Sequence, residues 1–235
     1  MPITLYDLAG ANPDLRFSPY CWRTRLALHH KGLDFEAVPH CFTGREQIAK
    51  SGQSKVPVIV DDGHWVHDSW KIALYLDETY PDLPLLFPDA AARAQAKFIN
   101  SWCDWSLLPN TRTLVVPEVI KVIAEADKAY FRSSREKALG MPLEQVGADK
   151  AAAMKSFVQG LKPAEATLDD QDFLHGAKPG YGDMALFGTL MWPVTLCPSD
   201  PIDRQSAVGK WFERMLALSP WVAKAPTVRS LAGAA

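Results

Sequence analysis

The chain has 235 residues, a formal net charge of −2, 48% apolar residues and 10% aromatic residues. This apolar content is enough for a sizeable core and argues against a disordered chain. Lysine and arginine are scattered and no segment has the length of a membrane span, so neither a nucleic acid nor a membrane is an expected partner.

Strand and helix signals alternate from the first residues onward. Ile3–Tyr6 is a short β-prone run, and a loop follows it. Ser18 and Pro19 predict a helix start, because serine is a preferred N-cap residue and proline fits the first helical turn. We expect this helix to end at Gly32, and residues 33–39 then alternate as a half-buried strand does. Strand, helix and strand form a βαβ unit with a right-handed crossover.

The next segment predicts a short helix and a second strand. Thr43 and Glu46 have the spacing of a capping box, and a helix to Ser51 follows them. Residues 55–60 have the composition of a strand, but this strand contains Pro57. Since proline has no N–H to donate, Pro57 must stand at a strand start, at a sheet edge or in a cis bend.

A hairpin and a further helix complete the first part of the chain. Residues 61–64, Asp-Asp-Gly-His, are a turn signal between two β-prone runs. Asp68 and Ser69 predict a helix cap, and apolar residues follow on one helical face up to Tyr80. Residues 1–80 therefore predict the order βαβαββα.

The pattern changes after residue 80. Residues 81–88 are rich in proline and have the composition of a linker. Residues 89–235 carry helical periodicity with almost no β-type alternation, in the segments 90–108, 117–138, 143–168, 183–191 and 206–218. We expect an α/β domain followed by an all-helical domain.

The start of the chain and its cysteines indicate the compartment. No basic leader with an apolar run precedes the first strand, so we expect a cytoplasmic protein. The four cysteines are far apart, and no His or Cys cluster has metal-ligand spacing. We therefore expect reduced thiols and no metal site.

The motifs resemble those of one family in their order and spacing. Val56-Pro57 precedes a hairpin, Asp68-Ser69 opens the next helix, residues 72–81 close that helix, and helices follow. In this combination the chain resembles a cytosolic glutathione transferase over nearly its whole length. Within the family, segments 3–8, 18–24 and 42–44 are most similar to the bacterial lignin β-aryl etherase class and to related fungal transferases. Both groups imply a serine-type active site.

The resemblance implies a fold, a co-substrate and an assembly. Residues 1–80 would be a thioredoxin-like domain that binds glutathione, and residues 81–88 would be a linker. Residues 89–235 would be an all-helical domain that contributes the hydrophobic substrate site of a homodimer. One position departs from the family, because Gly180 stands where Ser or Thr usually precedes the buried aspartate, here Asp183.

The resemblance also implies the residues that hold glutathione. Val56 and a cis Pro57 would pair with its cysteinyl backbone, and Asp68 with Ser69 would bind its γ-glutamyl end. Lys55 either faces the glycyl carboxylate or is a solvated lysine at a strand end.

Ser18 is the expected catalytic residue. A free thiol has a pKa of about 8.5, and the thiolate is the nucleophile. A hydrogen bond from Ser18 and the positive end of its helix could lower that pKa by about one to three units.

Two other residues compete for the central role. Cys21 gives the stretch a glutaredoxin-like spacing and would support thiol exchange with glutathione. Tyr6 ends the first strand, where another branch of the family keeps a catalytic tyrosine. The loop and helix around Ser18 favour serine over both.

The expected reaction is attack of glutathione thiolate on a hydrophobic aromatic electrophile, including cleavage of a β-aryl ether. Aromatic residues that could form the apolar wall of the second site are Tyr20, Trp102 and Trp105, although such residues are more often core. The alternatives are a non-catalytic ligandin for phenolic compounds and a thiol transferase that uses Cys21.

Overall fold

The computed structural model describes residues 2–233. Its first part contains, in order, β1 (Ile3–Leu8), α1 (Pro19–His30), β2 (Phe35–His40), the 3₁₀ helix η1 (Arg45–Ser51), β3 (Val58–Asp61), β4 (His64–His67) and α2 (Ser69–Thr79). The predicted order βαβαββα is confirmed, with a 3₁₀ helix as its second helical element.

The four strands form one mixed sheet with the order β2-β1-β3-β4. β1 and β2 are parallel, as the crossover through α1 requires, and β3 runs antiparallel to β1 and β4. The Val56–Pro57 bond is cis, and the strand begins only at Val58. Asp62 and Gly63, with φ values of 45° and 84°, make the predicted hairpin turn.

The rest of the described chain is helical. It contains α3 (Ala90–Trp102), the π-helical turn η2 (Cys103–Leu107), α4 (Leu108–Val122), α5 (Glu125–Leu139), α6 (Lys150–Leu168), α7 (Tyr181–Leu196), α8 (Ala207–Leu218), the 3₁₀ helix η3 (Val222–Lys224) and α9 (Val228–Ala232). The prediction of an all-helical second part is confirmed. Within residues 2–233, no helix is long and apolar enough to cross a membrane.

Several predicted helix boundaries are wrong, and the break expected at residues 109–116 lies inside α4. The segment 117–138 is divided between α4 and α5, because Ile123 and Ala124 are extended, with ψ values of 159° and 147°. The helix expected from residue 143 starts at Lys150, after a turn in which Gly147 has a φ of 69°. Side-chain periodicity continued through both breaks, so it did not reveal them.

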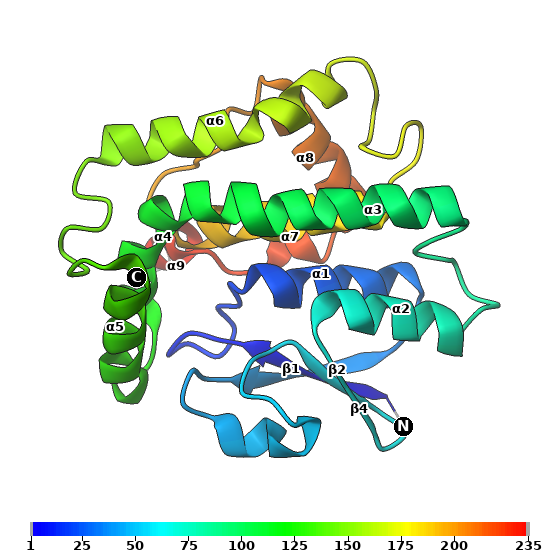
Figure 1. Cartoon of the computed structure of the whole chain (residues 1–235), viewed down its shortest axis with the longest axis horizontal. Helices are drawn as coiled ribbons and strands as arrows, with labels where there is room; N and C mark the ends of the chain where they lie inside the picture. Colours follow the sequence, from blue (N-terminus) through cyan, green and yellow to red (C-terminus); the bar gives the residue numbers. More distant parts are fainter. Residues whose placement is uncertain (1, 234–235) are drawn as a thin grey trace.

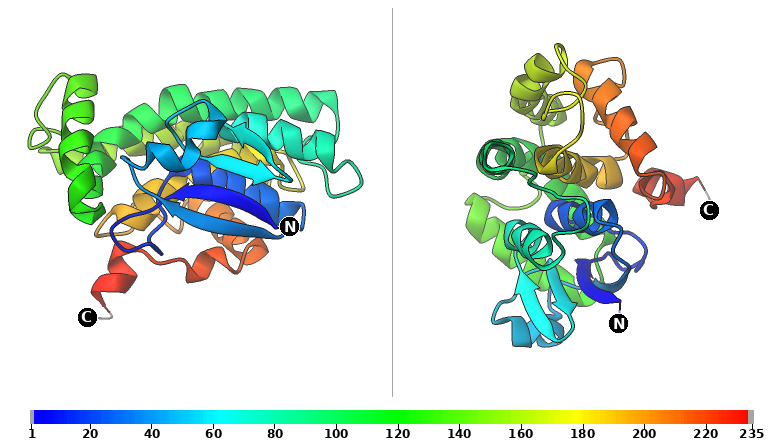
Figure 2. Two further views of the ribbon diagram at one scale, coloured as in Figure 1. Left: turned by 90° about the horizontal axis from the view of Figure 1, so that it is seen from below. Right: turned by 90° about the vertical axis from the view of Figure 1, so that its right-hand side faces the viewer.

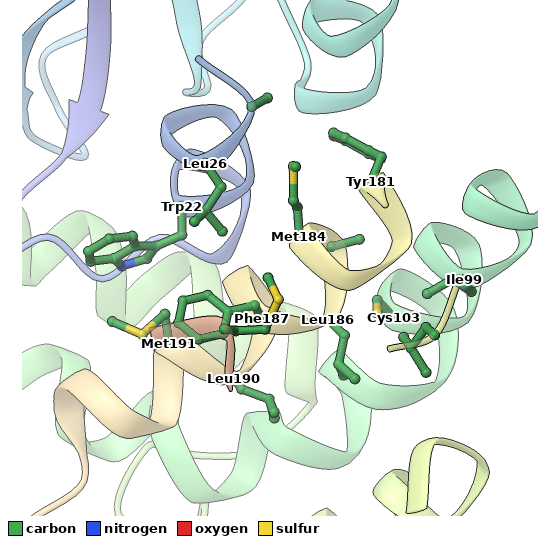
Figure 3. Close-up of a cluster of buried hydrophobic side chains, with 14 of the residues drawn as sticks. Trp22, Leu26, Ile99, Cys103, Tyr181, Met184, Leu186, Phe187, Leu190 and Met191 are labelled. Atoms are coloured by element: carbon green, nitrogen blue, oxygen red, sulfur yellow. The ribbon is translucent and has the colours of Figure 1, made fainter. Parts of the chain in front are cut away.

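The molecule is layered. α1 and α2 cover one face of the sheet and separate it from α3 and α7, whereas η1 lies on the opposite side (Figure 1). A view from the side shows the same layers (Figure 2). Buried side chains of α1, such as Trp22 and Leu26, belong to one cluster with Met184 and Phe187 of α7 (Figure 3). The two expected domains therefore share a hydrophobic core.

A glycine allows the close packing of α1 on α7. A Cβ atom at Gly188 would lie 2.8 Å from the Pro19 carbonyl oxygen and 2.9 Å from Arg23 Cγ. Since these distances are shorter than van der Waals contact, only glycine fits there without displacing α1. The first turn of α1 is thus positioned directly by α7.

The predicted capping box at Thr43 and Glu46 is wrong. Gly44 is the N-cap of η1, and no side chain caps this helix. Thr43 is bound to α5 instead: its backbone N–H and its Oγ1 donate to Asp127 Oδ1 at 3.0 and 2.7 Å. Phe42 N–H donates to Oδ2 of the same carboxylate at 2.9 Å. The buried Asp127 therefore attaches α5 to the loop after β2.

The start of α7 explains the departure at Gly180. Asp183 Oδ2 accepts from the Gly180 N–H at 3.0 Å, and its Oδ1 accepts from the Leu174 N–H and Trp211 Nε1 at 2.8 and 2.9 Å. A Cβ atom at Gly180 would lie 2.6 Å from Cγ of His175. In this chain the imidazole of His175 fills the space that a capping Ser or Thr would need.

Candidate functional site

Ser18 lies at the N-terminus of α1, as the sequence predicted. It is the N-cap residue, with an extended backbone, and its Oγ accepts a hydrogen bond from the Cys21 N–H at 3.3 Å. Accepting this bond leaves the hydroxyl proton of Ser18 available for another acceptor. The first turn of α1 contains no acidic residue, so no side chain of this turn opposes the positive end of the helix.

Cys21 lies behind Ser18, inside the core. Its side chain is 1% exposed and belongs to a buried cluster with Leu8 and Phe17. Burial raises the pKa of the Cys21 thiol well above its ordinary value, and the nearby Asp7 carboxylate raises it further. A buried thiol of high pKa is a poor nucleophile, so the geometry disfavours the thiol-transferase alternative.

Tyr6 faces the other side of the sheet. Successive residues of a strand point to opposite faces, and Leu5 lies in the core beneath α1 and α2. Tyr6 instead stacks on Trp65 of β4, with ring centroids 5.8 Å apart. The helix start at Ser18 is on the covered face, so the strand geometry disfavours Tyr6 as the catalytic residue.

The segment around the cis bond lies beside this helix start. Val56 packs against the buried cluster that contains Phe17 and Cys21. Among the described residues, no backbone hydrogen bond takes up the N–H or C=O of Val56. Pro57 is buried, and its carbonyl oxygen accepts from the Asp68 N–H at 3.4 Å. The structure thus links two of the predicted motifs, Val56-Pro57 and Asp68-Ser69.

Asp68 caps α2 in an unusual conformation. Its φ of 72° is in the left-handed region, which non-glycine residues rarely adopt and which recurs at ligand sites. One carboxylate oxygen, Oδ1, accepts from the N–H groups of Trp70 and Lys71 at 3.0 and 3.1 Å. Ser69 is buried, and its carbonyl oxygen accepts from the Tyr181 hydroxyl at 2.9 Å, which fixes this helix start against α7.

Lys55 has a different environment from the other candidates. Its side chain is exposed, and no carboxylate of the described residues lies within salt-bridge distance of it. The structure therefore leaves both predicted roles of Lys55 open. In residues 2–233, no group of three or more His, Cys, Asp or Glu side chains could hold a metal ion.

Tyr20 lies at the boundary between α1 and the helical region. Its ring is 38% exposed, and the Arg23 guanidinium lies 4.9 Å from the ring centroid. Burial raises the pKa of the Tyr20 phenol, and the negative charge of Asp104 adds to the rise. A half-exposed aromatic ring two residues from Ser18 can form one side of a site for a second substrate.

Sequence reasoning missed the network that holds Tyr20. Arg23 is fully buried, and its Nη1 donates to Asn100 and Asp104 at 3.0 and 2.8 Å. Its Nη2 donates to Thr189 of α7 at 2.9 Å. The π-helical turn η2 presents Asp104 to this guanidinium. A lone arginine on an amphipathic helix gave no signal for such a network, since this residue type usually marks a solvated edge.

The two tryptophan candidates are not enclosed against Ser18. Trp102 is partly buried and packs against the main core cluster. Trp105 is 84% exposed on the surface of η2. Of the three aromatic residues predicted for the apolar wall, only Tyr20 lies on the element that carries Ser18.

Comparisons with known proteins agree with this arrangement. Residues 17–79 match the family model for the N-terminal domain of glutathione S-transferases, and residues 94–221 match the model for the C-terminal domain. The glutathione S-transferase-like protein ustS of Aspergillus flavus is 32% identical over 221 residues, covering 81% of this chain and 80% of that protein. Glutathione S-transferase U28 of Arabidopsis thaliana is 29% identical over 76% of this chain and 70% of its own length.

Solved structures give the same result. A glutathione S-transferase of Ceriporiopsis subvermispora, solved in complex with glutathione, has a TM-score of 0.82 and 25% identity, covering 93% of this chain and 96% of that one. A glutathione transferase of Phanerochaete chrysosporium has a TM-score of 0.76 and 28% identity, covering 93% and 92%. The chain therefore belongs to the glutathione S-transferase family, whose co-substrate is glutathione.

Proposed function

We propose that Ser18 activates glutathione by donating its hydroxyl hydrogen bond to the sulfur and stabilising the thiolate. The supporting observation is the cap geometry: Ser18 Oγ accepts from the Cys21 N–H and so keeps its proton for an external acceptor. A hydrogen bond to a charged group contributes about 1.5–3 kcal/mol and a helix end about 0.3–1 kcal/mol. Since one pKa unit corresponds to about 1.36 kcal/mol, both together make the thiolate the main form at neutral pH.

The peptide part of glutathione would bind along the loops beside Ser18. The unpaired backbone groups of Val56 suit the addition of a short extended peptide. Ser69 and the N-terminal amides of α2 suit the γ-glutamyl carboxylate, and the second oxygen of Asp68 suits the γ-glutamyl ammonium. Lys55, which is exposed and directly precedes Val56, is proposed to bind the glycyl carboxylate.

The second substrate is an aromatic electrophile that binds against Tyr20. The thiolate attacks an electrophilic carbon, a carbon–sulfur bond forms, and the leaving group departs with the bonding electrons. In a β-aryl ether this leaving group is a phenolate. Support for the ether is the resemblance of segments 3–8, 18–24 and 42–44 to the etherase class.

We also propose that two copies associate. Phe98 and Trp105, one heptad apart on α3 and η2, are 75% and 84% exposed, and large exposed apolar side chains are typical of interfaces. A hollow of about 740 Å³ borders the same helix, between α2 and α3, with Trp70 and Phe87 in its lining. Light scattering should give the mass of a dimer, and Phe98→Glu should reduce it to that of a monomer.

The serine assignment is tested by substitution. We expect Ser18→Ala to lower kcat/KM for glutathione and 1-chloro-2,4-dinitrobenzene by about 10- to 100-fold at pH 7. In the same variant, the ultraviolet absorbance of thiolate in the protein–glutathione complex should also fall. Tyr6→Phe and Cys21→Ala should keep both the activity and the thiolate absorbance. The Tyr6 ring faces the other side of the sheet, and the Cys21 side chain is buried.

Each alternative has its own outcome. Full activity and full thiolate absorbance in Ser18→Ala would exclude serine activation. Loss of activity only in Cys21→Ala would indicate thiol transfer. Tight binding of a hydrophobic dye without turnover would indicate a ligandin, and phenol release from a model β-aryl ether would identify an etherase.

A further inference from the structure

The junction between α4 and α5 contacts both loops that flank the start of α1. The N–H of Ala11, in the loop between β1 and α1, donates to the Val122 carbonyl oxygen at 2.7 Å. The N–H groups of Phe42 and Thr43, in the loop after β2, donate to the Asp127 carboxylate at 2.9 and 3.0 Å. α5 lies at the end of the molecule where α1 begins (Figure 1). One corner of the helical region therefore holds two loops of the α/β domain.

The break between the two helices makes the first of these contacts possible. Val122 is the last residue of α4, and Ile123 is extended, with a ψ of 159°. Carbonyl groups of a last helical turn have no partner within the helix, so the Val122 oxygen can accept from Ala11. A Cβ atom at Gly10 would lie 2.8 Å from the same oxygen, which is closer than van der Waals contact. The end of α4 thus packs directly on the backbone of the loop before Ser18.

Asp127 directs its whole carboxylate at the loop after β2. Its side chain is buried, Oδ2 accepts from Phe42, and Oδ1 accepts from both the N–H and the Oγ1 of Thr43, the last at 2.7 Å. Within residues 2–233, no Lys, Arg or His nitrogen lies within 4.0 Å of this carboxylate, and the adjacent Lys128 pairs with Glu125. A buried carboxylate that loses its partners is costly, so these three bonds hold the loop firmly to α5.

Phe17, which directly precedes Ser18, is a third attachment to this corner. Its side chain is 1% exposed and belongs to a buried cluster with Val119 of α4 and Phe131 of α5. The ring of Phe42, on the loop that Asp127 binds, lies 6.4 Å from the Phe17 ring and 5.2 Å from the Phe131 ring, measured between centroids. The position of Ser18 therefore depends on how α4 and α5 hold its neighbours.

We propose that Asp127 is a positioning residue for glutathione: by holding the loop after β2, it keeps Ser18 and Val56 at the separation that the bound peptide requires. Val56 packs against the same buried cluster as Phe42, so the loop supports both walls of the site. This inference rests on the proposed function, because it assigns a distant residue to the site of Ser18. A displacement of about 1 Å can remove much of the effect of a binding or catalytic group.

The test separates positioning from stability. Asp127→Ala should raise the KM for glutathione by about tenfold and leave the KM for 1-chloro-2,4-dinitrobenzene unchanged, because the altered contacts lie on the glutathione side. It should also raise the pKa of the bound thiol, measured by thiolate absorbance against pH. Asp127→Asn keeps one acceptor oxygen, so both changes should be smaller. If Asp127→Ala does not fold, Asp127→Asn tests the inference with the same expected directions.

The matched control is Asp77, which also binds two neighbouring backbone N–H groups of a loop. Its carboxylate accepts from Leu86 and Phe87 at 3.0 and 2.9 Å, near the C-terminal end of α2. Asp77→Ala should lower the midpoint of urea unfolding, as Asp127→Ala should, but it should leave the KM for glutathione and the thiol pKa unchanged. If Asp127→Ala changes only the unfolding midpoint, or if both variants change the KM and the thiol pKa alike, the inference is overturned.

A double-mutant cycle with Ser18→Ala tests the route of the effect. If Asp127 acts through Ser18, Asp127→Ala should raise the thiol pKa in the wild-type background and change it little in the Ser18→Ala background. Equal shifts in both backgrounds would overturn the route through Ser18. If Ser18→Ala keeps full thiolate absorbance, the proposed function fails, and calorimetric titration with glutathione still tests Asp127. In that titration, equal affinity of wild type and Asp127→Ala would overturn the positioning role.

Discussion

The helices α1 and α7 pack against each other, yet their N-termini are capped differently. At α7, the cap residue Gly180 has no side chain, and the carboxylate of Asp183 neutralises the helix end from within. At α1, Ser18 caps a single N–H, and no acidic residue stands in the first turn. The first turn of α7 thus contains a buried carboxylate, whereas the first turn of α1 contains none.

This difference separates a structural helix start from a binding one. A helix end that contains its own buried carboxylate has no remaining attraction for an external anion. A helix end with only a neutral hydroxyl attracts an anion and can also donate a hydrogen bond to it. The comparison predicts that changes at α7 affect folding, whereas changes at α1 affect the pKa of the bound thiol.

The largest expected effect is at Asp183. In Asp183→Ala, the N–H groups of Leu174 and Gly180 and the Trp211 indole would lose their acceptor, and the first and last of these are buried. We expect the free energy of unfolding to fall by about 3–5 kcal/mol, measured by urea denaturation. Asp183→Asn keeps one acceptor oxygen, so its free energy of unfolding should fall by less. A loss below about 1 kcal/mol in Asp183→Ala would show that this carboxylate does not hold the helix start.

The next effect concerns Ser18 and appears in the pH profile. If Ser18 lowers the pKa of the bound thiol, Ser18→Ala returns that pKa toward about 8.5. The rising limb of the plot of kcat/KM against pH should therefore move upward by about one to two units. At pH 7 the variant is mostly thiol and slow, and at alkaline pH it approaches wild-type activity. An activity loss of the same factor at every pH would contradict the electrostatic role.

Local signals in the sequence predicted most of the fold. Ser18 with Pro19, and Asp68 before α2, are caps whose chemistry involves residues close in sequence, so these helix starts were predicted correctly. The break between α4 and α5 was missed because neither Ile123 nor Ala124 is a residue type that favours turns. Thr43 was assigned to a local cap, but it bonds to Asp127, far along the chain, and such contacts leave no local pattern.

In the candidate site, too, the residues in local motifs were predicted and those that depend on distant contacts were not. The glutathione motifs Val56-Pro57 and Asp68-Ser69 are short and were found by order and spacing. Arg23 gave no such signal, because its partners Asn100 and Thr189 lie far along the chain, and the side chain is fully buried beside α7.

A third experiment tests why α7 lacks a capping side chain. In Gly180→Ala the new Cβ would lie 2.6 Å from Cγ of His175, and overpacking of this kind costs about 1–3 kcal/mol. His175→Ala removes the obstacle, along with the acceptor of the Gly182 N–H at 3.2 Å. In a double-mutant cycle, the cost of Gly180→Ala should be smaller when His175 is absent. Equal costs in both backgrounds would mean that the glycine is needed for another reason.

The smallest expected effect comes from a serine cap that faces no site. Ser206 caps α8, and its Oγ accepts from the Gly209 N–H at 3.0 Å, much as Ser18 Oγ accepts from the Cys21 N–H. Ser206→Ala should therefore reduce the free energy of unfolding by about 1 kcal/mol, and we expect a similar loss of stability in Ser18→Ala. It should leave kcat/KM and the pH profile unchanged, because the cap alone does not activate a thiol. If both variants lost stability and activity to the same extent, the role of Ser18 would be that of an ordinary cap.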